Sequence, residues 1–253
     1  MKTANIVTAV VLTYNEERHI AACLNTLTWA DAMLVVDSIS TDATVQKAEQ
    51  CGARVIQNAF TNFAQQRNAA LQMVSDGWVF FVDADERCTE ELAREIRSVV
   101  VECQYPVWST PRDNYLFGKL TRGAGWYPDY QARLFQVGRA AFDPLREVHE
   151  VAMFEGDMGY LKHTLVHFNY ESVAQFHAKQ RRYAQLDAGI LYKQGVRPKF
   201  RNFILQPVRE FRRRFFVLKG YKDGWHGLHL CLLLAYYNFD MYHRLGRLWR
   251  QQS

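Results

Sequence analysis

The sequence has few cysteines and no closely paired ones. Its five cysteines, an odd number, stand at positions 23, 51, 88, 103 and 231, and none belongs to a CxxC motif. Paired or regularly spaced cysteines mark disulfide frameworks and structural zinc sites. Their absence argues against both, and we expect a protein of the reducing cytoplasm.

The glycine fingerprints of two common nucleotide sites are also absent. The 14 glycines form neither GxGxxG nor GxxxxGK[ST], the patterns of dinucleotide-binding sheets and of phosphate-binding loops. Nucleotide phosphates, if bound, must be held in another way.

Long apolar runs are missing as well. No stretch approaches the roughly 18 apolar residues that span a bilayer. Met1 and Lys2 lead almost directly into a short apolar run. We therefore expect a chain that is neither secreted nor membrane-spanning.

Apolar residues themselves are plentiful, at 49% of 253 residues, so the chain can bury a large core. Charge is distributed unevenly. Residues 197–253 hold 12 Lys/Arg and 3 Asp/Glu, whereas residues 1–196 hold 19 and 23. The net charge of +5 thus combines a mildly acidic body with a strongly basic tail, which predicts an anionic partner for the tail.

Four strand-like apolar runs, at residues 6–12, 33–36, 53–56 and 78–82, alternate with segments that carry helix signals. This alternation predicts an α/β fold with a parallel, doubly wound sheet. The strands would end along one rim, where ligands bind, at Thr13, Asp37, Asn58 and Asp83. Asp37 suits a contact with a ribose or base there, or it only binds the amides of its own turn.

Acidic residues crowd the end of the fourth run, which stops at Asp83, Ala84, Asp85 and Glu86. Clustered carboxylates repel one another unless a cation or a donor-rich ligand compensates them. Mg²⁺ and Mn²⁺ take oxygen ligands and share them with substrate phosphates. The cluster predicts a divalent-metal site that bridges a nucleotide diphosphate. Alternatively, the acids only begin the next helix, with Thr89 as its N-cap.

Four motifs resemble those of one enzyme family. They are TYNEE at residues 13–17, VVDSISTDAT at 35–44, AQQRN at 64–68 and DADER at 83–87. Their order and spacing are similar to those of the family-two inverting glycosyltransferases, which have the GT-A (Rossmann-like) nucleotide-diphospho-sugar transferase fold. Within that family, the chain is most similar to lipopolysaccharide core β-glucosyltransferases of the WaaE, KdtX and LgtF type, as far as about residue 183.

The resemblance implies a nucleotide-sugar donor, UDP-glucose, a divalent Mg or Mn ion, and a lipopolysaccharide core or other lipid-linked acceptor. The break at Gly195 and Pro198 predicts a GT-A domain over residues 1–195 and a C-terminal helical extension over residues 196–253. Carried over motif by motif, the donor-binding residues are Thr13, Tyr14, Glu16, Asp37, Gln66, Arg67, Asp83, Ala84 and Asp85, with Asp85 also counted as catalytic.

Residues 111–135 show few periodic signals and predict a functional loop. They contain turn-forming glycines and flat aromatic rings that suit sugars: Gly118, Gly123, Gly125, Tyr115, Trp126 and Tyr127. Aromatic residues more often belong to a core. The resemblance places the acceptor in this region, with Arg133 beside a short strand at residues 134–135.

Inversion at an anomeric carbon needs a base that removes the proton of the acceptor hydroxyl. The resemblance assigns this base to Glu150, in the VHE of REVHE. His149 is the rival because imidazole titrates near neutrality, although it could be an ordinary surface residue. Asp129 comes after these two.

The resemblance also assigns His167, together with Asp85, to the metal. His163 lies four residues earlier and could be mistaken for it. Considered alone, either histidine would more often be a structural residue than a ligand.

The basic tail predicts a partner surface. Ser172 is a candidate cap of a helix that runs to about residue 194, and beyond Gly195 and Pro198 aromatic and basic residues recur at helical spacing. Such an amphipathic segment can lie on an anionic membrane or pack on another subunit. No nucleic-acid motif accompanies the charge. We expect a cytoplasmic protein, peripheral at the inner face of the cytoplasmic membrane, with a homo-oligomer as the alternative use of this segment.

Two other functions fit parts of this pattern. A sugar-nucleotide nucleotidyltransferase would carry a glycine-rich basic loop after the first strand, and TYNEERH has no glycine. A non-catalytic binding module would have no need of a base at Glu150. The prediction is therefore an inverting, metal-dependent hexosyltransferase.

Overall fold

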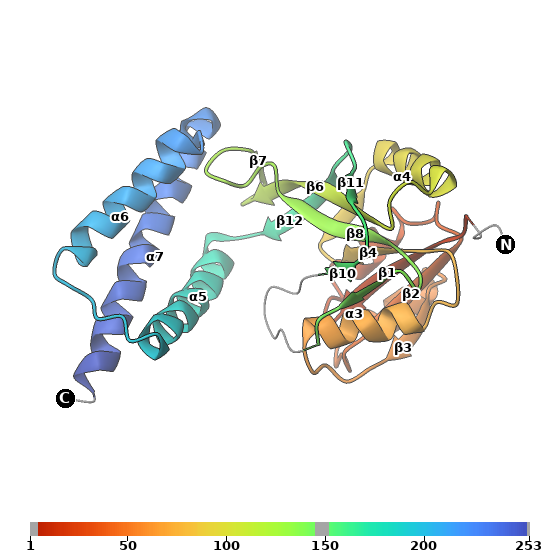
Figure 1. Ribbon diagram of the computed structural model, residues 1–253, viewed down its shortest axis with the longest axis horizontal. Helices are drawn as coiled ribbons and strands as arrows, with labels where there is room; N and C mark the ends of the chain where they lie inside the picture. Colours follow the sequence, from red (N-terminus) through yellow and green to blue (C-terminus); the bar gives the residue numbers. More distant parts are fainter. Residues whose placement is uncertain (1–4, 145–151, 252–253) are drawn as a thin grey trace. The chain divides into compact units, whose positions relative to one another are not determined.

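A computed structural model describes residues 5–144 and 152–251 (Figure 1). The chain forms two compact units. Met1–Arg112 and Tyr130–His167 make the sheet unit, and Asp113–Asp129 and Phe168–Ser253 make the helical unit. The boundary predicted at residue 195 falls inside the helical unit, because helix α5 (Val173–Lys193) packs against helix α7 (Gly224–Arg250).

Four parallel strands form the first half of the sheet, in the order β3-β2-β1-β4. They are β1 (Val7–Thr13), β2 (Ala32–Asp37), β3 (Arg54–Gln57) and β4 (Trp78–Asp83). The helices between them are α1 (Ile20–Leu24), α2 (Thr44–Gln50) and α3 (Phe63–Gln72). The predicted parallel, doubly wound sheet is confirmed.

Alternate residues of these strands pack into separate cores on the two faces of the sheet. Val11 of β1 and Phe80 of β4 share one core with α1 and α4 (Glu90–Glu102), whereas Val10 and Phe81 share the other with α3. Successive side chains of a strand point to opposite faces. Strands covered on both sides must therefore be apolar throughout, which explains the continuous apolar runs of the sequence.

Beyond β4 the sheet becomes mixed and continues in the order β4-β8-β6-β12-β5. Its strands are β5 (Glu86–Cys88), β6 (Val107–Leu116), β7 (Lys119–Thr121), β8 (Tyr130–Gln136), β11 (Met158–Tyr160) and β12 (Leu165–Tyr170). Strands β7 and β11 pair with β6. A separate two-stranded sheet joins β9 (Ala140–Phe142) and β10 (Ala152–Phe154).

The prediction of a loop over residues 111–135 was wrong for most of that segment. Strand β6 continues to Leu116, β7 follows after a two-residue turn, and β8 begins at Tyr130. Asn114 and Thr121 are both buried and face each other in the register of β6 and β7. Buried polar residues in paired strands weaken the alternating apolar signal, so these strands were hidden in the sequence.

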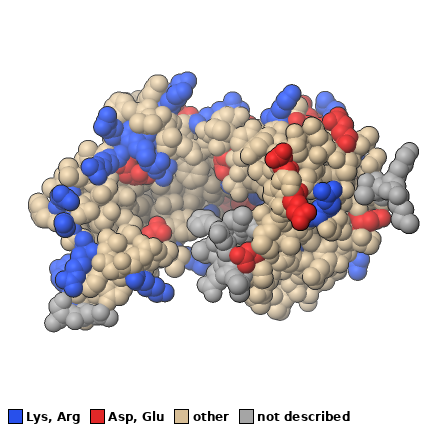
Figure 2. Space-filling view, viewed as in Figure 1, with Lys and Arg blue, Asp and Glu red and all other residues tan. Residues whose placement is uncertain are grey.

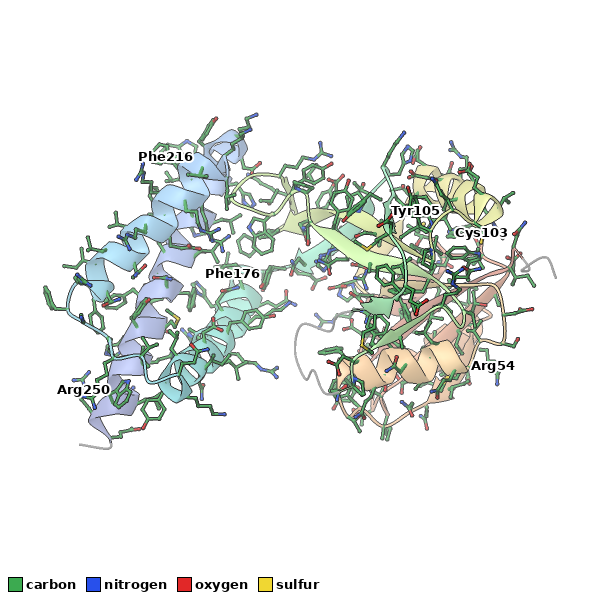
Figure 3. All side chains as sticks on the ribbon, in the orientation of Figure 1. Arg54, Cys103, Tyr105, Phe176, Phe216 and Arg250 are labelled. Atoms are coloured by element: carbon green, nitrogen blue, oxygen red, sulfur yellow. The ribbon has the colours of Figure 1, made fainter. Side chains whose placement is uncertain are left out.

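The helical unit consists mainly of α5, α6 (Asn202–Arg212) and α7. A π-helical turn (Arg213–Val217) and a 3-10 turn (Gly220–Asp223) join α6 to α7. Its core includes Phe176, labelled in Figure 3 at the start of α5, packed against Tyr170 and Tyr237. The predicted cap Ser172 is confirmed, since its hydroxyl accepts the Gln175 N–H at 3.2 Å. Within the described residues, no helix is long and apolar enough to cross a bilayer.

Candidate functional site

The carboxyl ends of β1, β2 and β4 lie where the strand order reverses. The chain proceeds outward from β1 to β2 and β3 and then returns to place β4 on the other side of β1. In open α/β sheets, ligands bind outside the carboxyl ends of the strands at such a reversal. Thr13, Asp37 and Asp83 end the three strands, so we place the candidate site at this edge of the sheet unit.

Asp37 is fully buried and its carboxylate is bound by its own loop. Oδ1 accepts the hydroxyl of Thr13 at 2.9 Å and that of Ser40 at 2.5 Å, and Oδ2 accepts the Ser40 N–H at 2.7 Å. In this structure Asp37 acts as a turn residue that fixes β1 to the loop after β2. A direct contact with a ribose stays a prediction.

The loops after β1 and β2 are tied together by further hydrogen bonds. Asn15, whose φ of 55° is left-handed, donates its N–H to the Ser40 hydroxyl, and its side chain accepts the Thr41 N–H, both at 2.8 Å. The Glu16 N–H donates to the Thr44 hydroxyl at 2.8 Å. Tyr14 is left exposed between these anchors. The first two motifs therefore form two loops joined by hydrogen bonds, with the exposed ring of Tyr14 available to a ligand.

The AQQRN motif lies on α3, and three of its residues reach different parts of the site. Gln66 is buried and donates to the Ser38 hydroxyl at 3.1 Å. Arg67 stacks over the ring of Phe81 at 5.0 Å and lies 3.7 Å from Asp83. Asn68 exchanges two 2.8 Å hydrogen bonds with the backbone of Phe142. Gln66 and Arg67 thus support the loops after β2 and β4, rather than forming an exposed surface.

Asp83 and Glu86 are neutralised by arginines. Arg133 donates to both oxygens of Asp83, at 3.2 and 2.5 Å, and to Oε1 of Glu86 at 2.6 Å. Arg112 lies 3.3 Å from the same Glu86 oxygen, and Glu86 Oε2 accepts the Asp83 N–H at 3.0 Å. Desolvation opposes ionisation of Asp83, but Arg133 and Arg67 outweigh it and hold the pKa of Asp83 well below its ordinary value. These two carboxylates therefore need no metal to compensate them.

Asp85 is the acid that remains open to a ligand. Its side chain is one-third exposed, and among the described residues it forms no ion pair with Lys or Arg. Asp85 Oδ2 lies 3.4 Å from Nε2 of His167, which β12 brings beside β5 by pairing His167 with Glu86. The structure thus brings together the two residues predicted to hold the metal, although they lie 82 positions apart in the sequence.

The donor atoms of this pair fit a divalent cation. Two ligands at right angles on an ion with bonds of ~2.1 Å lie about 3 Å apart, close to the observed separation. The carboxylate oxygen suits Mg²⁺ or Mn²⁺, and the imidazole nitrogen is a ligand that transition-metal ions accept more readily than Mg²⁺ does. No group of three or more His, Cys, Asp or Glu residues gathers in the described parts of the chain. Phosphate oxygens and water would supply further ligands to an ion held by this pair.

His163, the histidine that could be confused with His167, has a different role. Its Nδ1 lies 2.8 Å from Glu95 of α4, and Glu95 also accepts the His163 N–H at 2.9 Å. His163 therefore anchors the loop before β12. This contact makes it a suitable control for His167.

The aromatic residues proposed for the acceptor have three separate environments in the helical unit. Tyr115 packs on Phe168 with ring centroids 5.6 Å apart, and Trp126 packs on Tyr170 at 6.2 Å. Tyr127 is more exposed and lies under the guanidinium of Arg122 at 5.2 Å. Of the three, Tyr127 offers the most surface to a sugar ring.

Gly123, one of the predicted turn glycines, is required by packing. A Cβ at this position would lie 2.6 Å from the carbonyl oxygen of Lys219, and the Gly123 N–H donates to Asp223 at 2.7 Å. Any side chain here would push the turn away from the residues that lead into α7.

The candidate base Glu150 and its rival His149 lie outside the described residues, while Asp129 accepts a hydrogen bond from Asn114 at 3.0 Å.

The pairing of Arg112 and Arg133 with the acids Asp83 and Glu86 was not predicted from the sequence. Arg112 was placed in a loop, and Arg133 was assigned to the acceptor rather than to Asp83 and Glu86. Both lie on strands β6 and β8, which pair side by side. A signal was present, because a buried strand that contains an arginine requires a buried acid to pair with it.

The site lies where the strand order of the sheet reverses, and it contains the Asp85–His167 pair beside acids that are paired with arginines. This arrangement is typical of an α/β protein that binds a ligand at the carboxyl ends of its strands. Comparison with known families gives the particular one. Residues 8–136, half of the chain, match the family described as Glycosyl transferase family 2. The chain therefore belongs to glycosyl transferase family 2, and it is a glycosyltransferase. The matched span includes Thr13, Asp85 and Arg133, whereas His167 lies beyond it.

Relatives cover nearly the whole chain. The lipopolysaccharide core biosynthesis glycosyltransferase LpsC of Rhizobium meliloti is 28% identical over 243 residues, which are 91% of this chain and 88% of LpsC. An uncharacterized glycosyltransferase of Rickettsia bellii is 27% identical over 92% of this chain and 83% of its own length. Among solved structures, S. aureus TarS (residues 1–349) superimposes with a TM-score of 0.50 at 18% identity, covering 98% of this chain and 92% of that one. The predicted GT-A fold is confirmed.

Proposed function

We propose that this glycosyltransferase inverts the anomeric centre as it moves glucose from UDP-glucose to a lipopolysaccharide core or other lipid-linked acceptor. The observation that carries the proposal is the pair formed by Asp85 and His167 at 3.4 Å, beside the strand ends where a nucleotide diphosphate would lie. The similarity to LpsC, a lipopolysaccharide core enzyme by its name, supports the acceptor class.

Asp85 and His167 would hold one Mg²⁺ or Mn²⁺ ion. When bound, the ion supplies Lewis-acid stabilisation of the departing diphosphate. Asp83 is already paired with Arg133, so its part is to keep the DAD turn in place. Arg67, beside Asp83, adds a fixed positive charge to the same turn.

The residues around this pair would bind and orient the donor. Thr13, Asp37 and Gln66 fix the two loops that face the nucleotide. Tyr14 offers an exposed ring on which a base can stack. Ala84 is small and buried, which lets the turn between Asp83 and Asp85 approach the diphosphate closely.

Glu150 would act as the base that removes the proton of the acceptor hydroxyl while the bond to the diphosphate breaks. His149 is its rival in the same segment. A lipid-linked acceptor would be met at the inner face of the cytoplasmic membrane, where a peripheral enzyme reaches it.

A donor screen with metal variation tests the proposal. The full-length protein is incubated with UDP-glucose, UDP-GlcNAc, GDP-mannose and dTDP-glucose, with and without Mn²⁺ or Mg²⁺. Nucleotide release and the melting temperature are then recorded, since a ligand that binds the native state raises it. We expect UDP-glucose with a divalent ion to give the largest response.

The Asp85→Ala variant should reduce metal-dependent release to background. Asp76→Ala is the matched control, because Asp76 is an exposed acid just before the amino end of β4, away from the site. Metal-dependent release at the parental rate in the Asp85→Ala protein would refute the assignment. A larger response to another donor would replace glucose but keep the metal site.

A further inference from the structure

Helix α6 presents an uncovered face that is both apolar and basic. Phe200, Ile204 and Val208 follow one another at helical spacing and are 82%, 54% and 58% exposed. Arg201, Leu205 and Arg209 form the adjacent row, and Leu205 is 47% exposed. With Arg212, these residues make up what we call the α6 face: Phe200, Arg201, Ile204, Leu205, Val208, Arg209 and Arg212.

The other side of α6 packs within the helical unit. Phe203 lies against Phe239 of α7 with ring centroids 6.1 Å apart, and the two helices pack against each other. No residue of α6 is fully buried. The helix is therefore attached by one side only, and the α6 face stays exposed on the opposite side.

The charge of the α6 face is positive without compensation. Among the described residues, no acid forms an ion pair with Arg201, Arg209 or Arg212. The one acid of the helix, Glu210, is occupied by Arg213 at 3.0 Å and Arg214 at 2.5 Å. Figure 2 shows Lys and Arg side chains gathered over the helices of this unit, on the left.

The arginines alternate with apolar residues in a way that suits a lipid surface. A hollow on this face is lined by Arg201, Asn202, Leu205, Gln206 and Arg209. Arginines on either side of an exposed leucine can bind headgroup phosphates while the leucine reaches the acyl boundary. The exposed Phe216, labelled in Figure 3, adds another apolar side chain in the turn after α6.

A second copy of the chain fits this face less well. A two-fold interface places the same patch against itself, so Arg201, Arg209 and Arg212 of one copy would meet those of the other. Like charges brought together across an interface oppose association. An anionic leaflet offers negative charge to the arginines of the α6 face and an apolar layer to its exposed apolar side chains.

We propose that the α6 face docks the protein on anionic lipid bilayers, with α6 lying in the headgroup plane. This inference deepens the proposed function, since it explains how a lipid-linked acceptor is reached. Vesicle binding and donor hydrolysis are measured separately, so that failure of one is distinguishable from failure of the other. Each basic residue near an anionic leaflet strengthens binding roughly fivefold, about 1 kcal/mol.

Vesicle flotation tests the proposal with the full-length protein. Neutral phosphatidylcholine vesicles are compared with vesicles that contain phosphatidylglycerol, at low and high salt. We expect binding to the anionic vesicles only, and weaker binding at high salt because salt screens charge. Equal binding to both kinds of vesicle, or binding to neither, would overturn the proposal.

Two sets of variants locate the surface. Arg201→Gln/Arg209→Gln/Arg212→Gln should weaken anionic-vesicle binding by roughly 100-fold. The matched control Arg54→Gln/Arg139→Gln/Lys162→Gln removes the same charge from exposed positions of the sheet unit and should lose much less. Ile204→Ser/Val208→Ser should also weaken binding, whereas Val101→Ser, at an exposed site on α4, should not.

Melting temperatures and donor hydrolysis accompany every variant. Hydrolysis should stay at the parental level, since the α6 face lies outside the candidate site. If the arginine variant binds vesicles like its control, the α6 face is not the membrane surface. If the variants instead convert an oligomer to a monomer in size-exclusion chromatography without changing vesicle binding, the face is a subunit interface and the proposal is wrong.

Discussion

Arg133 binds the Asp83 carboxylate in a bidentate pair, in which Nη1 donates to Oδ1 at 3.2 Å and Nη2 donates to Oδ2 at 2.5 Å. The first acid of the DAD turn is thus fixed by the protein, and the second, Asp85, is left for a ligand. A motif that reads as two equivalent carboxylates contains one acid paired with arginines and one that, among the described residues, forms no ion pair with Lys or Arg.

Replacing Arg133 should cost more stability than replacing a surface arginine. Arg133→Met leaves the buried Glu86 with Arg112 as its remaining ion-pair partner and should lower the free energy of unfolding by about 3–5 kcal/mol. Arg94→Met breaks only exposed pairs with Glu90 and Glu91 and should cost about 1 kcal/mol or less. Urea denaturation measures both. Equal losses would mean that the buried network contributes no more than a surface pair.

Asp37→Ala should affect stability as well as donor binding. It removes the acceptor of the Thr13 and Ser40 hydroxyls in a buried position and should cost about 1–3 kcal/mol. Ser40→Ala keeps Asp37 but removes one of these bonds. Calorimetry with UDP then separates the two roles. If Ser40→Ala weakens UDP binding as much as Asp37→Ala does, Asp37 acts only by shaping its loop.

His167→Ala should raise the Mn²⁺ concentration needed for half-maximal activity by at least roughly 10-fold. His163→Ala is the control. His163 contacts Glu95 and anchors the loop before β12, and among the described residues it forms no ion pair with Asp85. Metal titration of donor hydrolysis gives both values. The same shift in the two variants would point to a general loosening of this loop, and not to metal ligation.

Glu150→Gln should separate binding from chemistry. The amide keeps the size of the side chain but cannot accept the hydroxyl proton, so transfer should fall by roughly 100-fold or more while donor and metal binding survive. His149→Ala should reduce transfer less. Single-turnover rates and calorimetry with UDP test the pair. A near-parental transfer rate in Glu150→Gln would move the base to His149 or Asp129.

The helical unit should lose stability as the pH falls below neutrality. His226 lies 2.9 Å from the Thr121 hydroxyl. Burial, followed by the charges of Lys119 and His229, lowers its pKa below the ordinary 6.5, against the opposing effect of Asp223. The unfolded chain therefore takes up a proton before the folded chain does, so His226 destabilises the folded state as the pH falls through 6.5 toward the folded pKa. His226→Gln should show a smaller loss between pH 7.5 and 5.5 in urea denaturation. An unchanged loss would exclude His226 as its source.

The parallel strands were predictable because burial on both faces leaves an unbroken apolar run. Each of β1 to β4 was predicted to within one residue at either end. The antiparallel half was predicted only in part, since the expected strand at residues 134–135 lies within the longer β8. Its strands contain Arg112, Asn114 and Arg133, whose burial depends on partners that come from elsewhere in the chain.

A cluster of acids at this site was predictable from the sequence. Which acids pair with arginines and which one does not was not predictable. Three carboxylates in DADER suggested a single cation. The structure assigns two of them to arginines on β6 and β8, strands that follow in the sequence by tens of residues. No local pattern links Asp83 to Arg133, so only the folded sheet could distinguish the acid paired with arginine from Asp85.

The helical unit is built from two separate stretches of chain, Asp113–Asp129 and Phe168–Ser253. Leu116 from the first stretch is buried among Phe176, Leu230 and Tyr237 from the second. Genetic exchange between relatives therefore cannot transfer this unit with one crossover near residue 167, because the new helices would meet the old Leu116 and Gly123. A working chimera must replace both stretches together, and selection should keep them as one inherited block.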